Sequence, residues 1–294
     1  AIQPPLIERD GVLAKLKDTL AEPGRAVLVH GETGAGKSRI VEEAVKTLPG
    51  DFIVLRCRSL RDSGMDIFGE WFRGWAGGDS VSVFREKLYD FIDRVEGTGV
   101  AGAGEITDEL LRAESVLAAV LGIYWDGSLY RGLDPQGRYD NTVSVISAFI
   151  HGWMFLGGRT LAVDDLQWID DDSLDLLEAV LEEMDPRPSL LFTSTLTGLP
   201  GNISWVTGDP LILELNPLSI DGAAWFLRWS LGSQPSEDLL RWFFDKTEGN
   251  PFFMEQYAGL LDSPRVIPDE EKSFPGNLHS LMVARLDRLE ESLR

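Results

Sequence analysis

A glycine-rich segment, GETGAGKS at Gly31–Ser38, lies between a short apolar run and a helical pattern. The apolar run, Ala26–His30, has the length and composition of a strand that is buried on both faces. From Lys37 to Leu48 apolar residues recur at helical spacing, and Pro49–Gly50 end the pattern. A strand, a glycine-rich loop and a helix in this order are typical of an α/β fold with a parallel sheet.

Four further apolar runs predict more strands of the same sheet. Asp51–Cys57 follows the first helix, so strand, helix and strand form a βαβ unit with parallel strands and a right-handed crossover. The remaining strands are predicted at Thr160–Asp164, Leu190–Thr195 and Leu211–Leu215. We therefore expect an α/β three-layer sandwich with a five-stranded, mostly parallel sheet.

Two long regions are predicted to be helical. The first, about residues 59–158, is a helical excursion between two strands, in which Trp71, Phe72 and Trp75 are expected to pack in the interior. Its helices are expected near Asp66–Trp75, Val81–Val95, Glu105–Ile123 and Tyr139–Leu156, with a flexible connection at Gly97–Glu105. The second region has helices expected near Ser219–Leu231, Ser236–Lys246, Pro251–Leu261 and Leu278–Leu293. We assign 1–216 to the sheet domain and 217–294 to a small all-α domain.

Two shorter patterns refine this picture. Ser173–Met184 has the spacing of an amphipathic helix, and one of the three acids at Asp170–Asp172 is expected to cap it. The run AAWFLRWSL at Ala223–Leu231 is apolar around much of its circumference, which predicts a helix packed between two layers.

Composition excludes several classes of protein. The net charge of -21 argues against direct nucleic-acid binding, because phosphate binding depends on clustered Lys and Arg. One cysteine, Cys57, forms no internal disulfide and fits a reducing compartment, and the three separated histidines predict no structural zinc site. No signal peptide is evident, and the apolar segment Val143–Gly158 is too short to span a bilayer. We expect a cytoplasmic protein without membrane contact.

The ends of the chain carry a further expectation. It starts with Ala rather than Met and ends inside a helical pattern, LMVARLDRLEESLR. We therefore expect it to be a piece of a longer protein.

The segment Gly31–Ser38 matches the P-loop pattern in full, in the structural context that gives the pattern its meaning. Its glycines let backbone N–H groups approach phosphate oxygens, and the following helix directs its positive end at the same charge. Lys37 would bridge the β- and γ-phosphates, and Ser38 would ligate Mg²⁺. The alternative is a glycine-rich turn without a ligand. The predicted nucleotide-binding residues here are Gly31, Glu32, Thr33, Gly34, Ala35, Gly36, Lys37, Ser38 and Arg39.

A pair of acids at the end of a later strand completes the predicted site. In TLAVDDLQW, Asp164 and Asp165 follow four mostly apolar residues, at the edge where ligands bind in open α/β sheets. Asp164 should hold Mg²⁺, and Asp165 is placed to polarise the water that attacks the γ-phosphate. The alternative is that the two acids only cap the segment that follows them.

DDLQWIDDDSLDLLEAV, the P-loop and KTEGNPFFMEQ at Lys246–Gln256 together resemble the signal-transduction ATPases with numerous domains (STAND), a branch of the AAA+-like P-loop ATPases. The ATPase modules of maltose-type transcription regulators and class III adenylate cyclases are the most similar. The resemblance extends from Leu6 to Arg294. It implies that backbone near Ile7 borders the adenine, and that Pro251 in the GNP triplet packs close to it in a lid. Ser219 is a plausible cap for the first helix of that lid.

The chain departs from this family at two places. Glu8 stands where the family usually has glycine. The family's fourth strand often ends with an arginine that senses the γ-phosphate, whereas LLFTSTLTGLP has Thr195 and Thr197 and no arginine. Neutral hydroxyls donate hydrogen bonds to phosphate but supply no charge. We expect slow turnover, or hydrolysis completed by an arginine from another chain or domain.

Three functions remain as hypotheses. The leading one is an ATP- and magnesium-binding switch in a multidomain signalling or transcription-regulating protein, with flanking effector and sensor domains and nucleotide-dependent self-association. The second is a ring-type AAA+ motor or loader that acts on nucleic acid or protein. The third is a module that binds nucleotide only as a structural brace. Stimulation of hydrolysis by DNA or RNA would separate the second from the first.

Overall fold

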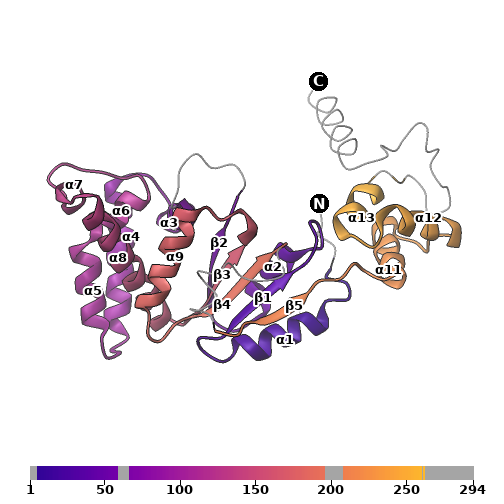
Figure 1. The fold of residues 1–294 in the computed structure, drawn as a ribbon, viewed down its shortest axis with the longest axis horizontal. Coiled ribbons are helices and arrows are strands. Elements are labelled where there is room, and N and C mark those ends of the chain that lie inside the picture. The colour runs from indigo at the N-terminus through magenta and orange to yellow at the C-terminus, as the bar shows by residue number, and fades with distance from the viewer. Residues whose placement is uncertain (1–4, 59–65, 196–207, 260, 262–294) are drawn as a thin grey trace, which may run out of the picture. The chain divides into compact units, whose positions relative to one another are not determined.

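A computed structural model of the chain describes residues 5–58, 66–195, 208–259 and 261 (Figure 1). The chain forms two compact units, which we describe separately. The sheet unit consists of residues 12–31 and 37–214, and the helical unit of residues 1–11, 32–36 and 215–294. The assignment of 217–294 as a separate lid domain stays a prediction.

The sheet unit is built on a five-stranded sheet with the order β2-β3-β4-β1-β5, in which every pairing is parallel. The strands are β1 (Ala26–His30), β2 (Asp51–Arg56), β3 (Gly158–Asp164), β4 (Ser189–Ser194) and β5 (Leu211–Glu214). The predicted α/β class and all five strands are confirmed. β1, α2 and β2 form the predicted βαβ unit in this parallel sheet, and β3 and β4 lie between its two strands.

Both faces of the three central strands, β3, β4 and β1, are covered, so neighbouring residues of these strands are buried on opposite sides. In β1, Val27, Leu28 and Val29 all have 0% exposure, which explains why the run is apolar without alternation. α2 (Lys37–Thr47) contacts β3 and β4, while α3 (Asp66–Ala76) contacts β2 and α8 (Pro135–Phe155) contacts β3. α1 (Asp10–Leu20) precedes β1, and Figure 1 shows α9 (Asp171–Glu183) and the helices between β2 and β3 on the side of the sheet opposite to α2.

The helical excursion lies between β2 and β3, and its described residues, 66–157, contain no strand, as predicted. Its remaining helices are α4 (Val81–Gly97), α5 (Ala103–Arg112), α6 (Glu114–Val120) and α7 (Leu129–Gly132). Trp71, Phe72 and Trp75 pack edge-to-face around Phe149 of α8, so their predicted role in packing is confirmed. The single helix predicted over Glu105–Ile123 is wrong. Ala113 leaves helical geometry, and α5 and α6 each bury their own apolar side against α8.

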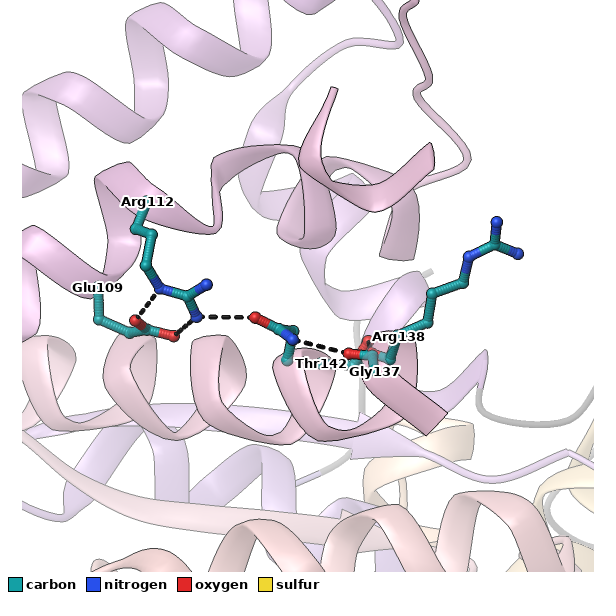
Figure 2. A network of polar contacts seen from close by, with 6 residues as sticks. Glu109, Arg112, Gly137, Arg138 and Thr142 are labelled. Carbon is teal, nitrogen blue, oxygen red and sulfur yellow. Dashed lines mark hydrogen bonds and ion pairs between the residues drawn. The ribbon is translucent and has the colours of Figure 1, made fainter. Parts of the chain in front are cut away.

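A polar network fastens α5 to α8 at the surface of this excursion (Figure 2). The guanidinium of Arg112 donates to both carboxylate oxygens of Glu109, at 2.7 and 2.6 Å, and also to the side chain of Asn141, at 2.8 Å. Asn141 in turn donates to the Gly137 carbonyl. The Arg112 hydrogen bonds hold the pKa of Glu109 below its usual value. Because Arg112 is exposed and Glu109 and Asn141 are partly exposed, we expect this network to contribute little to the stability of the fold.

The helical unit contains α11 (Ile220–Leu231), α12 (Glu237–Thr247) and α13 (Pro251–Ala258). They share a core that includes Leu218, Phe226, Leu227, Phe243 and Met254. Ser219 caps α11 as predicted, by accepting a hydrogen bond from the Gly222 N–H. The prediction that α11 packs between two layers is wrong for the described residues, because Trp225 and Trp229 are 44% and 37% exposed. The helix predicted at Leu278–Leu293 lies outside the described residues.

The N-terminal segment is clamped to the start of α11 within the helical unit. Glu8 has a positive φ of 55°, a conformation that glycine adopts without strain, which explains the glycine usual in the resembling family. Its carboxylate accepts hydrogen bonds from the N–H and the hydroxyl of Ser219. The buried Arg9 guanidinium donates to the Asn216 carbonyl at 2.7 Å. Glu8 therefore adopts a backbone conformation that is strained for a residue with a side chain, and its hydrogen bonds to Ser219 hold it there.

Asp170 caps α9, where its carboxylate accepts from the N–H of Ser173 at 2.8 Å, so the predicted cap is confirmed.

Cys57 is buried directly after β2. Among the described helices, none combines the length and the apolar character needed to cross a bilayer.

Candidate nucleotide-binding site

The two ends of the loop Gly31–Ser38 belong to the sheet unit, at the carboxyl end of β1. The Gly31 N–H donates to the Ser194 carbonyl at the end of β4. Lys37 is 6% exposed, and its Nζ donates to the Gly31 carbonyl at 3.0 Å. Burial lowers the pKa of Lys37, while Asp165 and then Asp164 favour its charged form. The two carboxylates keep Lys37 charged in spite of its burial, and its positive charge is the feature of this cluster that attracts an anionic ligand.

Asp164 is the last residue of β3 and is 4% exposed. Its Oδ1 accepts from the Thr193 hydroxyl at 2.5 Å, and Ser38 is also hydrogen-bonded to this carboxylate. Burial is the largest influence on its pKa and raises it, although Thr193 and Ser38 oppose the shift. A buried carboxylate with a raised pKa gains from a nearby cation.

The oxygens of Ser38 and Asp164 fit the predicted magnesium ion. Mg²⁺ takes hard oxygen ligands and is usually held by one or two carboxylates together with substrate phosphates and water. The hydroxyl and the carboxylate are in direct contact, so the two predicted ligands lie side by side. Within the described part of the chain there is no group of three or more His, Cys, Asp or Glu side chains that could hold a metal.

Asp165 follows β3 in the left-handed conformation, with φ 60° and ψ 45°. Its backbone N–H donates to the Thr193 hydroxyl at 2.9 Å, and its carboxylate accepts from Gln167 Nε2 at 3.0 Å. The left-handed turn directs the chain away from the strand, so the two neighbouring acids take different environments: Asp164 is buried, and Asp165 is partly exposed.

The middle of the loop, residues 32–36, belongs to the helical unit and contacts the start of α13. Asn250 Nδ2 donates to the Thr33 carbonyl at 3.0 Å, and the Phe252 N–H donates to the Gly34 carbonyl at 3.2 Å. Gly34 has a φ of +85°, and a Cβ there would lie 2.7 Å from Asn250 Oδ1 and from Phe252 Cβ. Glycine is therefore required at position 34 by both conformation and space.

The structure brings together, in the sheet unit, the predicted residues Gly31, Lys37, Ser38, Asp164 and Asp165. Ile7 and Pro251 lie in the helical unit, where Ile7 packs against the shared helical core and Pro251 begins α13. Arg39 forms an ion pair with Glu42 at 3.7 Å. The roles of these residues toward a nucleotide stay predictions, and Thr197 lies outside the described residues.

Three residues that contact the predicted motifs were missed by the sequence reasoning: Thr193 and Gln167 in the sheet unit, and Asn250 in the helical unit. Thr193 is hydrogen-bonded to both acids and has 0% exposure. The feature that could have revealed it is a polar hydroxyl inside an apolar strand, two residues before Thr195. Gln167 lies within DDLQW, but it is uncharged, and nothing in the motif indicated that its side chain contacts Asp165. Asn250 is the middle residue of the GNP triplet, in which only the proline was assigned a role.

We predict that Asn250→Ala lowers the free energy of unfolding by about 1–3 kcal/mol, because it removes the cap of α13 and the bond to Thr33. Asn250→Asp keeps an acceptor for the Phe252 N–H and loses only the donor to Thr33, so it should recover part of the loss. Urea unfolding measures both. Ser236→Ala removes the comparable cap of α12 and is the control. Equal losses in Asn250→Ala and Ser236→Ala, with full recovery in Asn250→Asp, would show that the Thr33 bond contributes nothing.

Comparisons with known proteins agree with the motifs. Residues 5–193 match the model of a family described as an AAA ATPase domain. The chain is also similar to an uncharacterized protein of Rhizobium meliloti (strain 1021), with 27% identity over 318 aligned positions that cover 97% of the chain. The chain spans about 28% of that relative's length. Because the family model matches more than half of its length, the chain belongs to the AAA ATPase domain family.

Proposed function

We propose that this chain is an ATP- and magnesium-dependent switch module of a larger protein, and that it hydrolyses ATP slowly. The observation that carries the proposal is the cluster at the carboxyl ends of β1 and β3. There a buried Lys37 lies in the field of Asp164 and Asp165, and Ser38 is bonded to Asp164. Family membership supports nucleotide binding and ATPase chemistry. The length of the Rhizobium meliloti relative supports a module of a longer protein.

Each residue has a defined task in this proposal. The N–H groups of the loop and Lys37 bind the phosphates, and Ser38 and Asp164 hold Mg²⁺, which when bound neutralises charge on the phosphate oxygens. Asp165, with its carboxylate partly exposed, accepts a proton from the attacking water. The sequence from Leu190 to Leu211 contains no arginine, so no positive side chain follows β4 to stabilise the transition state. Slow turnover makes the nucleotide state long-lived, as a switch requires.

A STAND-like switch further requires that ADP and ATP support different arrangements of the protein. Two observations support a link between nucleotide and helices. Residues 32–36 of the loop group with the helical unit, and Thr33 and Gly34 are bonded to the start of α13. A change in the loop on phosphate binding would therefore reach Thr33 and Gly34, which are hydrogen-bonded to the start of α13. Flanking effector and sensor domains, and self-association in the ATP state, are parts of this proposal.

Two measurements test the proposal. Calorimetry with ATP or ADP, with and without Mg²⁺, should give saturable binding that Mg²⁺ strengthens for ATP. Sedimentation or size-exclusion chromatography should then give a different hydrodynamic size with ADP than with a non-hydrolysable ATP analogue. Equal sizes in both states would contradict the switch while leaving nucleotide binding intact. Strong stimulation of hydrolysis by DNA or RNA would instead favour the motor or loader.

A further inference from the structure

Gln167 links the carboxylate of Asp165 to the end of β4. Its Nε2 donates to Asp165 Oδ1 at 3.0 Å, and its Oε1 accepts from the Thr195 N–H at 3.1 Å. The two partners fix the orientation of the amide, because a backbone N–H can only donate and an ionised carboxylate can only accept. Glutamine suits this position because its neutral side chain is both a donor and an acceptor.

The end of β4 contacts the rest of the site through three consecutive residues. The Thr193 hydroxyl donates to Asp164 and accepts from the Asp165 N–H, and the Ser194 carbonyl accepts from the Gly31 N–H. Thr195 then bonds Gln167. The backbone of Asp165 is thus held by Thr193, and its carboxylate is held by Gln167. In the sequence, Thr195 and Thr197 belong to the segment in which the resembling family often has its phosphate-sensing arginine.

We propose that Gln167 is a positioning residue that holds the Asp165 carboxylate in its working orientation and couples it to the end of β4. The inference rests on the proposed role of Asp165 as the group that polarises water. The terminal torsion of an aspartate is broad, so a partly exposed carboxylate needs a partner to define its direction. A misplacement of about 1 Å in such a group can reduce the rate about 100-fold. Gln167 itself touches neither phosphate nor water in this account.

The test uses Gln167→Ala and Gln167→Glu in the 294-residue chain. Both should lower kcat for ATP hydrolysis by about 10- to 100-fold, and Gln167→Ala, which adds no charge, should change KM and the nucleotide Kd less than about 3-fold. The glutamate has the size of glutamine and still accepts from the Thr195 N–H, but it cannot donate to Asp165. If Gln167 only fills space, Gln167→Glu should retain the wild-type kcat, and this result would overturn the proposal.

The chain offers a matched control in Gln136, which donates to Asp140 at 2.8 Å on α8, within the helical excursion. Gln136→Ala removes a similar bond outside the site and should leave kcat unchanged. In a double-mutant cycle, Gln167→Ala should lower the rate little further once Asp165→Asn is present, because both act through one group. Fully additive losses would contradict the coupling. If Asp165→Asn loses activity and Gln167→Ala does not, this inference fails and the proposed function stands. If Asp165→Asn keeps the wild-type rate, the role of Asp165 fails first.

Discussion

Replacing Lys37 with alanine is expected to weaken ATP binding by about 10- to 150-fold. The estimate takes about 1.5–3 kcal/mol for a hydrogen bond to a charged group, and a tenfold change in Kd for each 1.4 kcal/mol. Lys37 is buried beside Asp164 and Asp165, and a negative triphosphate brought to the same place would meet two carboxylates without an opposing cation. Hydrolysis should fall further than binding, because the charge on the phosphoryl group spreads in the transition state.

Calorimetry measures the affinity, and release of phosphate measures the turnover. Lys46→Ala is the matched control, because Lys46 lies on the same helix, is 55% exposed in its side chain and pairs only loosely with Glu43, at 3.9 Å. That variant should bind ATP like the wild type. If Lys37→Ala binds ATP with unchanged affinity, the assignment of Gly31–Ser38 as the phosphate loop is wrong.

The second large effect is expected for Asp165→Asn, which should lower kcat by about 10²- to 10⁴-fold while ATP binding is kept or strengthened. Asparagine has the shape of aspartate and also tolerates the left-handed backbone found at this position, so the change removes charge without adding strain. Losing one negative charge near Lys37 leaves more positive potential for phosphate. Alanine would be a poorer test, because its Cβ costs energy at a positive φ and its side chain cannot bond Gln167.

Single-turnover hydrolysis and a binding isotherm on the same sample separate the two effects. Asp172→Asn, an exposed acid in the first turn of α9, is the control for a general loss of negative charge. It should leave kcat within about 2-fold of wild type, since the charge of an exposed side chain is screened by water and salt. Unchanged turnover in Asp165→Asn would remove Asp165 from its proposed role and leave the binding part of the site untouched.

The strands were predictable because their signals are local. A run such as Ala26–His30 is apolar at every position, since both faces of a parallel strand are buried, and this pattern can be read without knowing the neighbours. The placement of Asp164 and Asp165 follows from the same argument, because polar residues directly after a buried strand must lie at its carboxyl end. The starts of helices could also be predicted where the sequence has a capping residue, as at Asp170 and Ser219.

The break between α5 and α6 could not be predicted from the local sequence. Residues 105–123 keep helical spacing through Ala113, where no proline or glycine marks an end. Ala113 has 0% exposure, and the two helices on either side of it each pack against α8. Leu110 and Val116, on either side of the break, are also fully buried, and the partner that both helices pack against begins only at Pro135. The position of α11 could not be predicted from the sequence for the same reason. Apolar residues all around a helix do not show which other elements pack against it, and Trp225 and Trp229 are partly exposed.

For this chain, the amino-acid pattern alone established the α/β class, the five strands, the phosphate-loop signature and the pair of acids after β3, because each depends on residues a few positions apart. The strand order β2-β3-β4-β1-β5 came from the tertiary structure, and with it the contacts of Thr193 and Gln167 with the two acids. The same holds for Asn250 and Thr33, which are 217 residues apart. Hydrogen bonds between distant segments leave no periodic trace in the sequence, so the residues that position the predicted loop and Asp165 became visible only once the chain was folded.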